Sequence, residues 1–113
     1  MRALLAIIIL AASQIVMAAE SAPNFDIKRT CRPAAAAILP GRDSPGCQRD
    51  EQDARSKLNN GWSQYSGEDR SRCAGFVQVG GAPSYVELLT CLEMAKQAKE
   101  LREKSKIETT GQR

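Results

Sequence analysis

The fold is set by residues 73–91, which read CAGFVQVGGAPSYVELLTC. Glycine and proline in the turn at residues 80–83 break any helix that enters it. Cys73 and Cys91 each lie nine residues from Ala82, at the centre of that turn. In an antiparallel helical hairpin, residues equidistant from the turn face each other, and a disulfide needs α-carbons only about 4.4–6.8 Å apart. This stretch therefore predicts two antiparallel helices joined by a disulfide.

The other two cysteines repeat this arrangement around a second turn. Cys31 and Cys47 each lie eight residues from Leu39, beside the turn Pro40-Gly41. Four cysteines allow three connectivities, and the symmetry about the two turns favours pairing in sequence order. Each bridge would close a loop of about 15 to 20 residues and contribute about 3 kcal/mol in the chain-entropy model.

Turn residues divide most of the chain into four helical segments: residues 31–39, 43–65, 66–79 and 84–106. The third begins with a Ser-x-x-Asp pattern at Ser66, and the fourth with a full Ser-x-x-Glu capping box at Ser84. Residues at three- or four-residue steps predict one inward face on each of the last three segments. These residues are Cys47, Glu51, Ala54, Leu58, Trp62 and Tyr65, then Cys73, Phe76 and Val77, and finally Leu88, Leu92, Ala95, Ala98 and Leu101.

The second of these segments has a weak point at Asn59-Asn60-Gly61. Glycine in a helix interior costs about 1 kcal/mol relative to alanine, so the helix can kink or end there. We prefer a continuous helix, because Trp62 and Tyr65 stay on the same face. The chain is thus predicted to be all-α, a small bundle of disulfide-stapled antiparallel helical hairpins.

Residues 1–19 have the layout of a secretory signal peptide. Arg2 supplies a positive charge, residues 3–12 form an unbroken apolar run, and small residues end the segment at Ala18-Ala19. A membrane anchor is the alternative, but the run is shorter than the roughly 20 residues that a spanning helix needs. We expect no membrane span after cleavage. The predicted organisation is a signal peptide (1–19), an extended arm (20–30), a helical disulfide-stabilised domain (31–106) and a flexible tail (107–113).

Export determines how the cysteines are interpreted. An even number of cysteines in a short exported chain predicts structural disulfides. The segments between them hold 15, 25 and 17 residues, whereas zinc ligands and redox pairs lie two to four residues apart. We therefore expect a bacterial protein of the periplasm or of the secreted fraction, with no metal and no cofactor.

Composition excludes several classes of function. The chain has no histidine, the usual general base of serine and cysteine nucleophiles. After Arg2 is removed with the leader, the chain has 15 basic and 13 acidic residues, and basic and acidic residues are interleaved along it. A nucleic-acid-binding protein would show a stripe of one sign. We expect neither an enzyme nor a nucleic-acid partner.

The acidic clusters have a structural explanation. Asp50, Glu51 and Asp53 lie early in one predicted helix, and Glu68 and Asp69 lie early in the next, where free amides and the helix dipole favour negative charge. The aromatic residues are needed mainly as core, although tryptophan and tyrosine are also favoured interface anchors. The turn at residues 80–85 is the best candidate for an exposed recognition loop. The candidate interaction residues are Trp62, Tyr65, Gly80, Gly81, Pro83 and Tyr85.

Part of the chain resembles a known family. Cys47 is followed by Glu51 and then by Ala54-Arg55-x-x-Leu58-Asn59-x-x-Trp62. This pattern, within residues 31–65, resembles the helical repeat of the LprI-type lysozyme-inhibitor family, which shows cysteine followed by Ala-Asp-x-x-Leu-Asn-x-x-Tyr. Here Arg55 replaces the family's aspartate and Trp62 its tyrosine, and Cys31 is comparable to the family's earlier cysteine. The second half is similar to small exported bacterial proteins of unassigned function. The resemblance implies a periplasmic or secreted helical module acting on a hydrolase such as a lysozyme.

These observations lead to three hypotheses about function. The first is an exported, non-enzymatic helical protein of the bacterial cell envelope that acts by contact with a protein partner. The second is a periplasmic or secreted lysozyme inhibitor, acting through the turn at residues 80–85 or the face near Trp62. The third is an exported thiol-redox or metal-handling protein, and the redox activity would require a reactive or easily reduced cysteine pair.

Overall fold

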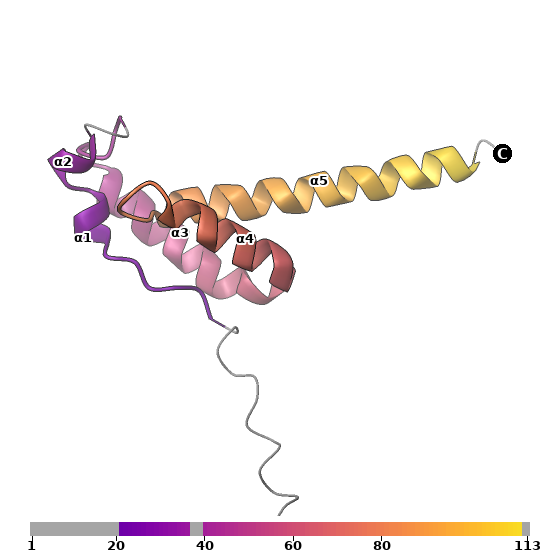
Figure 1. Ribbon diagram of the computed structural model, residues 1–113, viewed down its shortest axis with the longest axis horizontal. Coiled ribbons are helices and arrows are strands. Elements are labelled where there is room, and N and C mark those ends of the chain that lie inside the picture. The colour runs from indigo at the N-terminus through magenta and orange to yellow at the C-terminus, as the bar shows by residue number, and fades with distance from the viewer. Residues whose placement is uncertain (1–20, 37–39, 112–113) are drawn as a thin grey trace, which may run out of the picture.

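Five α-helices and one short 3₁₀-helix form the part of the chain that the computed structural model describes, residues 21–36 and 40–111. Figure 1 shows them in chain order, with no strand in these ranges, so the prediction of an all-α protein is confirmed. The predicted leader, residues 1–19, lies outside the described residues. The elements are α1 (Ile27–Thr30), α2 (Pro33–Ala36), α3 (Cys47–Gly61), the 3₁₀-helix η2 (Trp62–Gln64), α4 (Gly67–Gln78) and α5 (Tyr85–Gly111).

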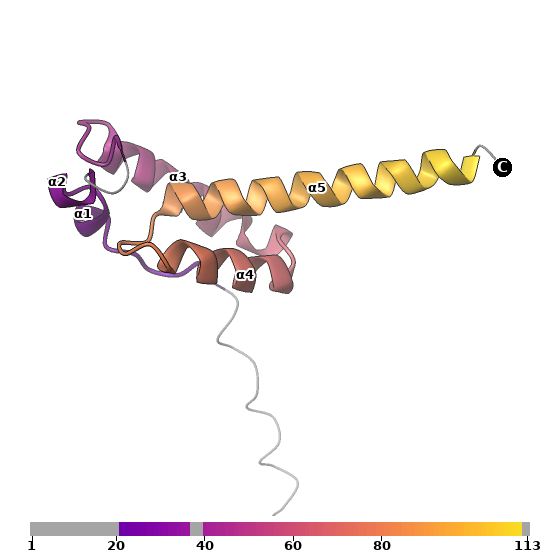
Figure 2. The same cartoon turned by 45° about the horizontal axis from the view of Figure 1, so that its top comes forward.

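The core lies between α3, α4 and the first half of α5. Leu58 of α3 and Leu88 and Leu92 of α5 have no exposed surface. Both α3 and α4 pack along α5, as the two views in Figures 1 and 2 show. Burial of each leucine side chain contributes roughly 2 kcal/mol, so this three-helix contact is the main apolar stabilisation of the fold. The other buried members of the cluster are Ala54, Trp62, Cys73, Val77 and Tyr85.

Both disulfides have the predicted sequence-order pairing. Cys31, directly after α1, is bonded to Cys47, the first residue of α3, with α-carbons 5.8 Å apart. Cys73 of α4 is bonded to Cys91 of α5, with α-carbons 5.7 Å apart. The distances of the cysteines from their turns therefore indicated the correct partners. Only the second bridge, however, joins two long antiparallel helices.

The first predicted hairpin differs from expectation. Of its first predicted helix, residues 31–39, the described part contains α2 (Pro33–Ala36), and residues 37–39 lie outside the described residues. Its second helix begins at Cys47 instead of near Asp43. Two consecutive turns precede α3: Ser44 N–H donates to Gly41 O (3.1 Å), and Cys47 N–H donates to Ser44 O (3.0 Å). Gly41 has a φ of +90°, which glycine adopts readily and which no residue of a right-handed helix has.

The predicted extended arm at residues 20–30 is helical in its last four residues. Residues 22–26 contain no helix, but Ile27–Thr30 form α1. Asp26 caps this helix, because its side chain accepts a hydrogen bond from Arg29 N–H (3.2 Å). Aspartate before a run of non-glycine residues is a regular N-cap signal, and the capped turn brings Cys31 to α3.

Two further helix boundaries follow local chemistry. Ser66 has an extended backbone and accepts a hydrogen bond from Asp69 N–H (3.2 Å), so the predicted cap of α4 is confirmed. At Gly61 the α-helix ends and η2 follows directly, which is the alternative that glycine allowed at this position. The preference for a continuous α-helix is wrong, but Trp62 still reaches the core and Tyr65 is half-buried.

The last helix is longer than predicted. α5 continues to Gly111, so residues 107–111 of the predicted flexible tail are helical. Ala98 and Leu101, predicted to face inward, are exposed, because α5 extends past both of its neighbours. Residues 96–111, all exposed, form a C-terminal arm. From here on, the word arm refers to this segment and not to the extended arm predicted at residues 20–30. Figure 2 shows this arm extending away from α3 and α4.

Candidate interaction surface

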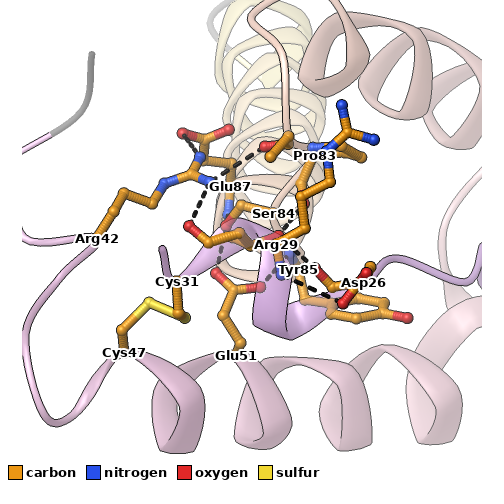
Figure 3. The surroundings of a disulfide bond; sticks show 12 residues. Asp26, Arg29, Cys31, Arg42, Cys47, Glu51, Pro83, Ser84, Tyr85 and Glu87 are labelled. Carbon is orange, nitrogen blue, oxygen red and sulfur yellow. Dashed lines mark hydrogen bonds and ion pairs between the residues drawn. A yellow bond between two sulfur atoms is a disulfide. The ribbon is translucent and has the colours of Figure 1, made fainter. Parts of the chain in front are cut away.

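A buried carboxylate joins α3 to the start of α5 (Figure 3). Glu51 is 3% exposed. It accepts hydrogen bonds from the Ser84 hydroxyl and from Tyr85 N–H, the latter at 2.7 Å. The same Ser84 oxygen accepts a hydrogen bond from Glu87 N–H (3.2 Å), which confirms half of the predicted capping box. The charge of Glu51 is satisfied by donors at a helix N-terminus, so this residue has a structural role.

A buried arginine makes the second polar link near the first disulfide. The guanidinium of Arg42 donates to Thr30 O (3.3 Å), to Ala82 O (3.1 Å) and to Glu87 Oε1 (3.0 Å). These three acceptors belong to the end of α1, to the turn before α5 and to α5 itself. Thr30 adds a hydrogen bond from its hydroxyl to Pro83 O (2.7 Å). Figure 3 shows how this network brings residues near Cys31–Cys47 against the 80–87 segment.

The pKa shifts in the molecule also have structural causes. A hydrogen bond from the Ser66 hydroxyl, followed by one from the Arg72 guanidinium, lowers the pKa of Asp69. Burial raises the pKa of Tyr65, and the nearby charge of Glu93 raises it further. Among the described residues, acidic and cysteine side chains form no cluster that could hold a metal ion.

Most of the predicted interaction residues are not available to a partner. Trp62 and Pro83 are buried and half-buried, respectively, and Tyr85 has no exposed surface. The hydroxyl of Tyr85 accepts a hydrogen bond from Phe25 N–H (2.7 Å), and the two rings lie 4.8 Å apart between centroids. The prediction that Tyr85 belongs to an exposed loop is therefore wrong.

Within the predicted loop, the two glycines are exposed. Gly81 has a φ of +110°, which allows the chain to reverse between α4 and α5. The tight reversal brings Ser84 and Tyr85 within hydrogen-bond distance of Glu51 and leaves Gly80 and Gly81 at the surface. The role of this turn in the structure is to connect the two helices and to seat Tyr85 in the core.

An apolar groove lies between α4 and α5 beside the second disulfide. This α4–α5 groove has a volume of about 730 Å³. Phe76, predicted to face the core, is 70% exposed at its edge, because Cys73 and Val77 occupy the inner face of α4. From α5, Met94 is 64% exposed and Val86 is 39% exposed. The other lining residues are Arg72, Cys73, Glu87, Thr90, Cys91 and Ala95.

The apolar line of the groove continues along the arm. Ala98 and Leu101 lie four and seven residues after Met94, so all three share one face of the helix. Leu101 is 66% exposed. The opposite flank of the arm is charged: Lys99, Arg102, Glu103 and Lys106 line a polar crevice with residues at the start of α4. The arm thus presents an apolar stripe away from the domain and charged side chains toward it.

This surface was not predicted, although the sequence of α5 contains a signal for it. Met94 and Leu101 are seven residues apart and do not share the face defined by Leu88 and Leu92. Apolar residues on a second face of a helix indicate a second contact surface.

In the described part of the chain, no helix combines the length and the apolar character that a bilayer crossing requires. The chain matches no family model, no curated protein and no solved structure.

Proposed function

We propose that the protein is an exported, non-enzymatic helical protein of the bacterial cell envelope that acts by protein–protein contact through the α4–α5 groove. The observation that carries this proposal is the exposure of Phe76, Val86 and Met94 along one continuous depression. The largest exposed apolar patch of a soluble protein is often an interaction site.

Two features support export. The four cysteines are all disulfide-bonded, and such bonds persist in oxidising compartments such as the periplasm and the extracellular medium. Residues 1–19 have the composition of a signal peptide. The two bridges also suit a small domain with few large apolar residues, whose core alone contributes little stability.

The groove is suited to an amphipathic helix of a partner protein. It is bordered by two antiparallel helices, and its exposed apolar residues are flanked by Arg72 and Glu87. A helix that enters such a groove presents anchors at positions i, i+3 or i+4, and i+7. Phe76 and Met94 would contact these anchors, while the two flanking charges would orient the partner's polar side chains.

Site-specific photo-cross-linking in the exported protein tests this proposal. A photoreactive residue at Thr90 or Met94 is expected to capture a protein, and one at Lys57, an exposed residue of α3 outside the groove, is not. Phe76→Glu is expected to abolish capture, whereas the matched control Val79→Glu, at an 85% exposed position outside the groove, keeps it. Equal capture from Lys57, or capture that survives Phe76→Glu, would contradict the proposal.

The lysozyme-inhibitor hypothesis has its own test. The residues that carry the family resemblance include Cys47, Ala54, Leu58 and Trp62, which are core residues, so the resemblance concerns the scaffold. A net charge of +2 after leader removal also gives no electrostatic steering toward basic lysozymes. Loss of lysozyme activity at about micromolar protein would favour inhibition, and unchanged activity would rule out the inhibitor hypothesis. A rapidly reduced disulfide would instead favour the thiol-redox hypothesis.

A further inference from the structure

The arm and the α4–α5 groove are complementary features of one helix. Ala98 lies thirteen residues after Tyr85, where α5 begins, and thirteen residues before Gly111, where it ends. At 1.5 Å per residue, each half is about 20 Å long. One half borders the groove, and the other extends beyond the domain with Ala98 and Leu101 exposed at its start. The arm therefore has the length needed to cover a groove of the same kind.

We propose that the groove is occupied by the arm of a second copy of this chain. The two α5 helices pack antiparallel about a two-fold axis at Ala98, so that each arm lies along the groove of the other copy. This arrangement is isologous and closed, and it uses both unpaired surfaces at once. The inference rests on the proposed function, since it names the partner that enters the groove.

The residue pattern along α5 fits this register. In an antiparallel pair, residues equidistant from the axis face each other. Met94 lies four residues before Ala98 and Leu101 three residues after it, so Met94 of one copy meets Leu101 of the other. Ala98 is small and permits close approach of the two helices at the axis.

Charge complementarity supports the same register. Glu93 lies five residues before Ala98 and Lys104 six residues after it, and both are exposed. By helical periodicity they lie on the same flank of the apolar stripe. The axis therefore places Glu93 of each copy against Lys104 of the other, which gives two opposite-charge pairs.

The proposed contact covers the largest exposed apolar side chains of the groove and of the arm. Phe76, Val86, Met94 and Leu101 are exposed on each copy, and the two-fold arrangement brings both sets into one interface. A specific interface buries at least about 1,000 Å² in total. The flanking polar side chains add to the area that this arrangement buries. The apolar centre with a charged rim is the usual composition of a protein interface.

Sedimentation equilibrium of the exported, disulfide-bonded protein tests the dimer with a matched pair of variants. Leu101 and Ile107 are 66% and 72% exposed on the same arm, but they lie on different faces. Leu101→Glu is expected to weaken the dimer at least about tenfold, as for a central interface residue. Ile107→Glu is expected to leave the dissociation constant within about twofold of the wild type. Circular dichroism of both variants checks that α5 remains folded.

Charge reversal tests the register. Glu93→Lys alone places two lysines together and is expected to weaken the dimer, and Lys104→Glu alone does so with two glutamates. The double variant Glu93→Lys/Lys104→Glu restores opposite charges and is expected to bring the dissociation constant back toward that of the wild type. Two single effects that simply add in the double variant would overturn the proposed register.

Cysteine cross-linking provides a second, independent test of the axis. Ala98→Cys places two thiols beside the axis and is expected to give a covalent dimer in mild oxidant. Ser105 lies on the same face, but seven residues from the axis, so two cysteines there are about 21 Å apart along the helices. Ser105→Cys is therefore expected to remain uncross-linked. Equal cross-linking from both positions would indicate a parallel pair and overturn the inference.

The outcomes separate this inference from the proposed function. A monomer at about 100 μM, well above a micromolar dissociation constant, would overturn the dimer. If the groove then still captured a different protein in a Phe76-dependent manner, the proposed function would stand without the dimer. If it captured none, both proposals would fail.

Discussion

The two disulfide-closed parts of the molecule are alike in their covalent structure and different in what surrounds it. Both bridges span similar α-carbon distances, 5.8 and 5.7 Å, and similar sequence separations, 16 and 18 residues. Around Cys31–Cys47, directional hydrogen bonds of Arg42 and Glu51 hold short helices and turns together. Around Cys73–Cys91, long helices bury leucine side chains.

This difference shows two ways in which a disulfide-closed pair of segments can be stabilised. The second part has enough apolar periodicity to pack by burial, which is not directional and tolerates small displacements. The first part lacks such residues and depends on a few buried polar groups, each of which must keep its partner. A single substitution should therefore act through cavity formation in one part and through loss of a hydrogen-bond partner in the other.

The largest effect is expected in the apolar part. Leu88→Ala creates a cavity at a fully buried position and should lower the free energy of unfolding by about 4 kcal/mol. Leu101→Ala removes the same side chain from an exposed position of the same helix and should change it by less than about 0.5 kcal/mol in dilute solution. Urea unfolding followed by circular dichroism measures both. A similar loss for both variants would show that the arm is packed.

Removal of either disulfide should cost nearly the same stability but release different regions. The chain-entropy model gives about 3 kcal/mol for each loop, because their lengths are similar. Cys31→Ser/Cys47→Ser is expected to increase amide exchange in residues 27–46, with α4 and α5 still protected. Cys73→Ser/Cys91→Ser is expected to increase exchange throughout the three-helix core. Hydrogen exchange with mass spectrometry distinguishes the two patterns, and identical patterns would mean that the two parts unfold as one unit.

The polar part has its own sensitive position. Glu51→Ala removes the acceptor of the Ser84 hydroxyl and of Tyr85 N–H, and should lower the free energy of unfolding by about 2 kcal/mol. Asp53→Ala, at an exposed position two residues along the same helix, is the control and should change it by less than about 0.5 kcal/mol. Thermal unfolding of both variants measures the difference. A value for Glu51→Ala as small as that for Asp53→Ala would refute the structural role of the buried carboxylate.

The smallest effect concerns pH and the start of α4. The folded-state pKa of Asp69 lies below its ordinary value of 3.8, mainly because the Ser66 hydroxyl bonds the carboxylate. The ionised carboxylate therefore stabilises the fold above pH 3.8, and this contribution is lost as the pH falls through the lower folded value. Asp69→Asn should lower the unfolding temperature slightly at pH 7, with the difference from the wild type shrinking below pH 4. A difference that is independent of pH would contradict this assignment.

Local signals predicted the parts of the fold that depend on local chemistry. The caps at Ser66 and Ser84 and the pairing of the cysteines follow from short spacings in the chain. The links from Arg42 to Glu87 and from Ser84 to Glu51 could not be predicted, because they join residues 45 and 33 positions apart. A glutamate on an otherwise apolar face of a helix was nevertheless a signal for a buried acceptor.

Helical periodicity also predicted the wrong environment for three residues of the groove and the arm. It placed Phe76 in the core, although Cys73 and Val77 occupy the inner face of α4. It also placed Ala98 and Leu101 there, because a helical pattern does not state where the neighbouring helix ends. α5 extends beyond α3 and α4, so the apolar stripe continues where no helix of the same chain covers it. The exposure of Ala98 and Leu101 on the arm is thus a consequence of unequal helix lengths, which single-residue spacings do not reveal.

The position of Trp62 makes its intrinsic fluorescence a probe of unfolding. It is the single tryptophan of the chain, it is 6% exposed, and the Arg70 guanidinium lies 5.6 Å from the centre of its ring. Ala22 and Pro23 border the same pocket, so the indole lies between the core and the N-terminal segment. Its emission should shift to longer wavelength when that segment detaches, and further when the core opens. Fluorescence can therefore follow the two events in sequence, without any attached label.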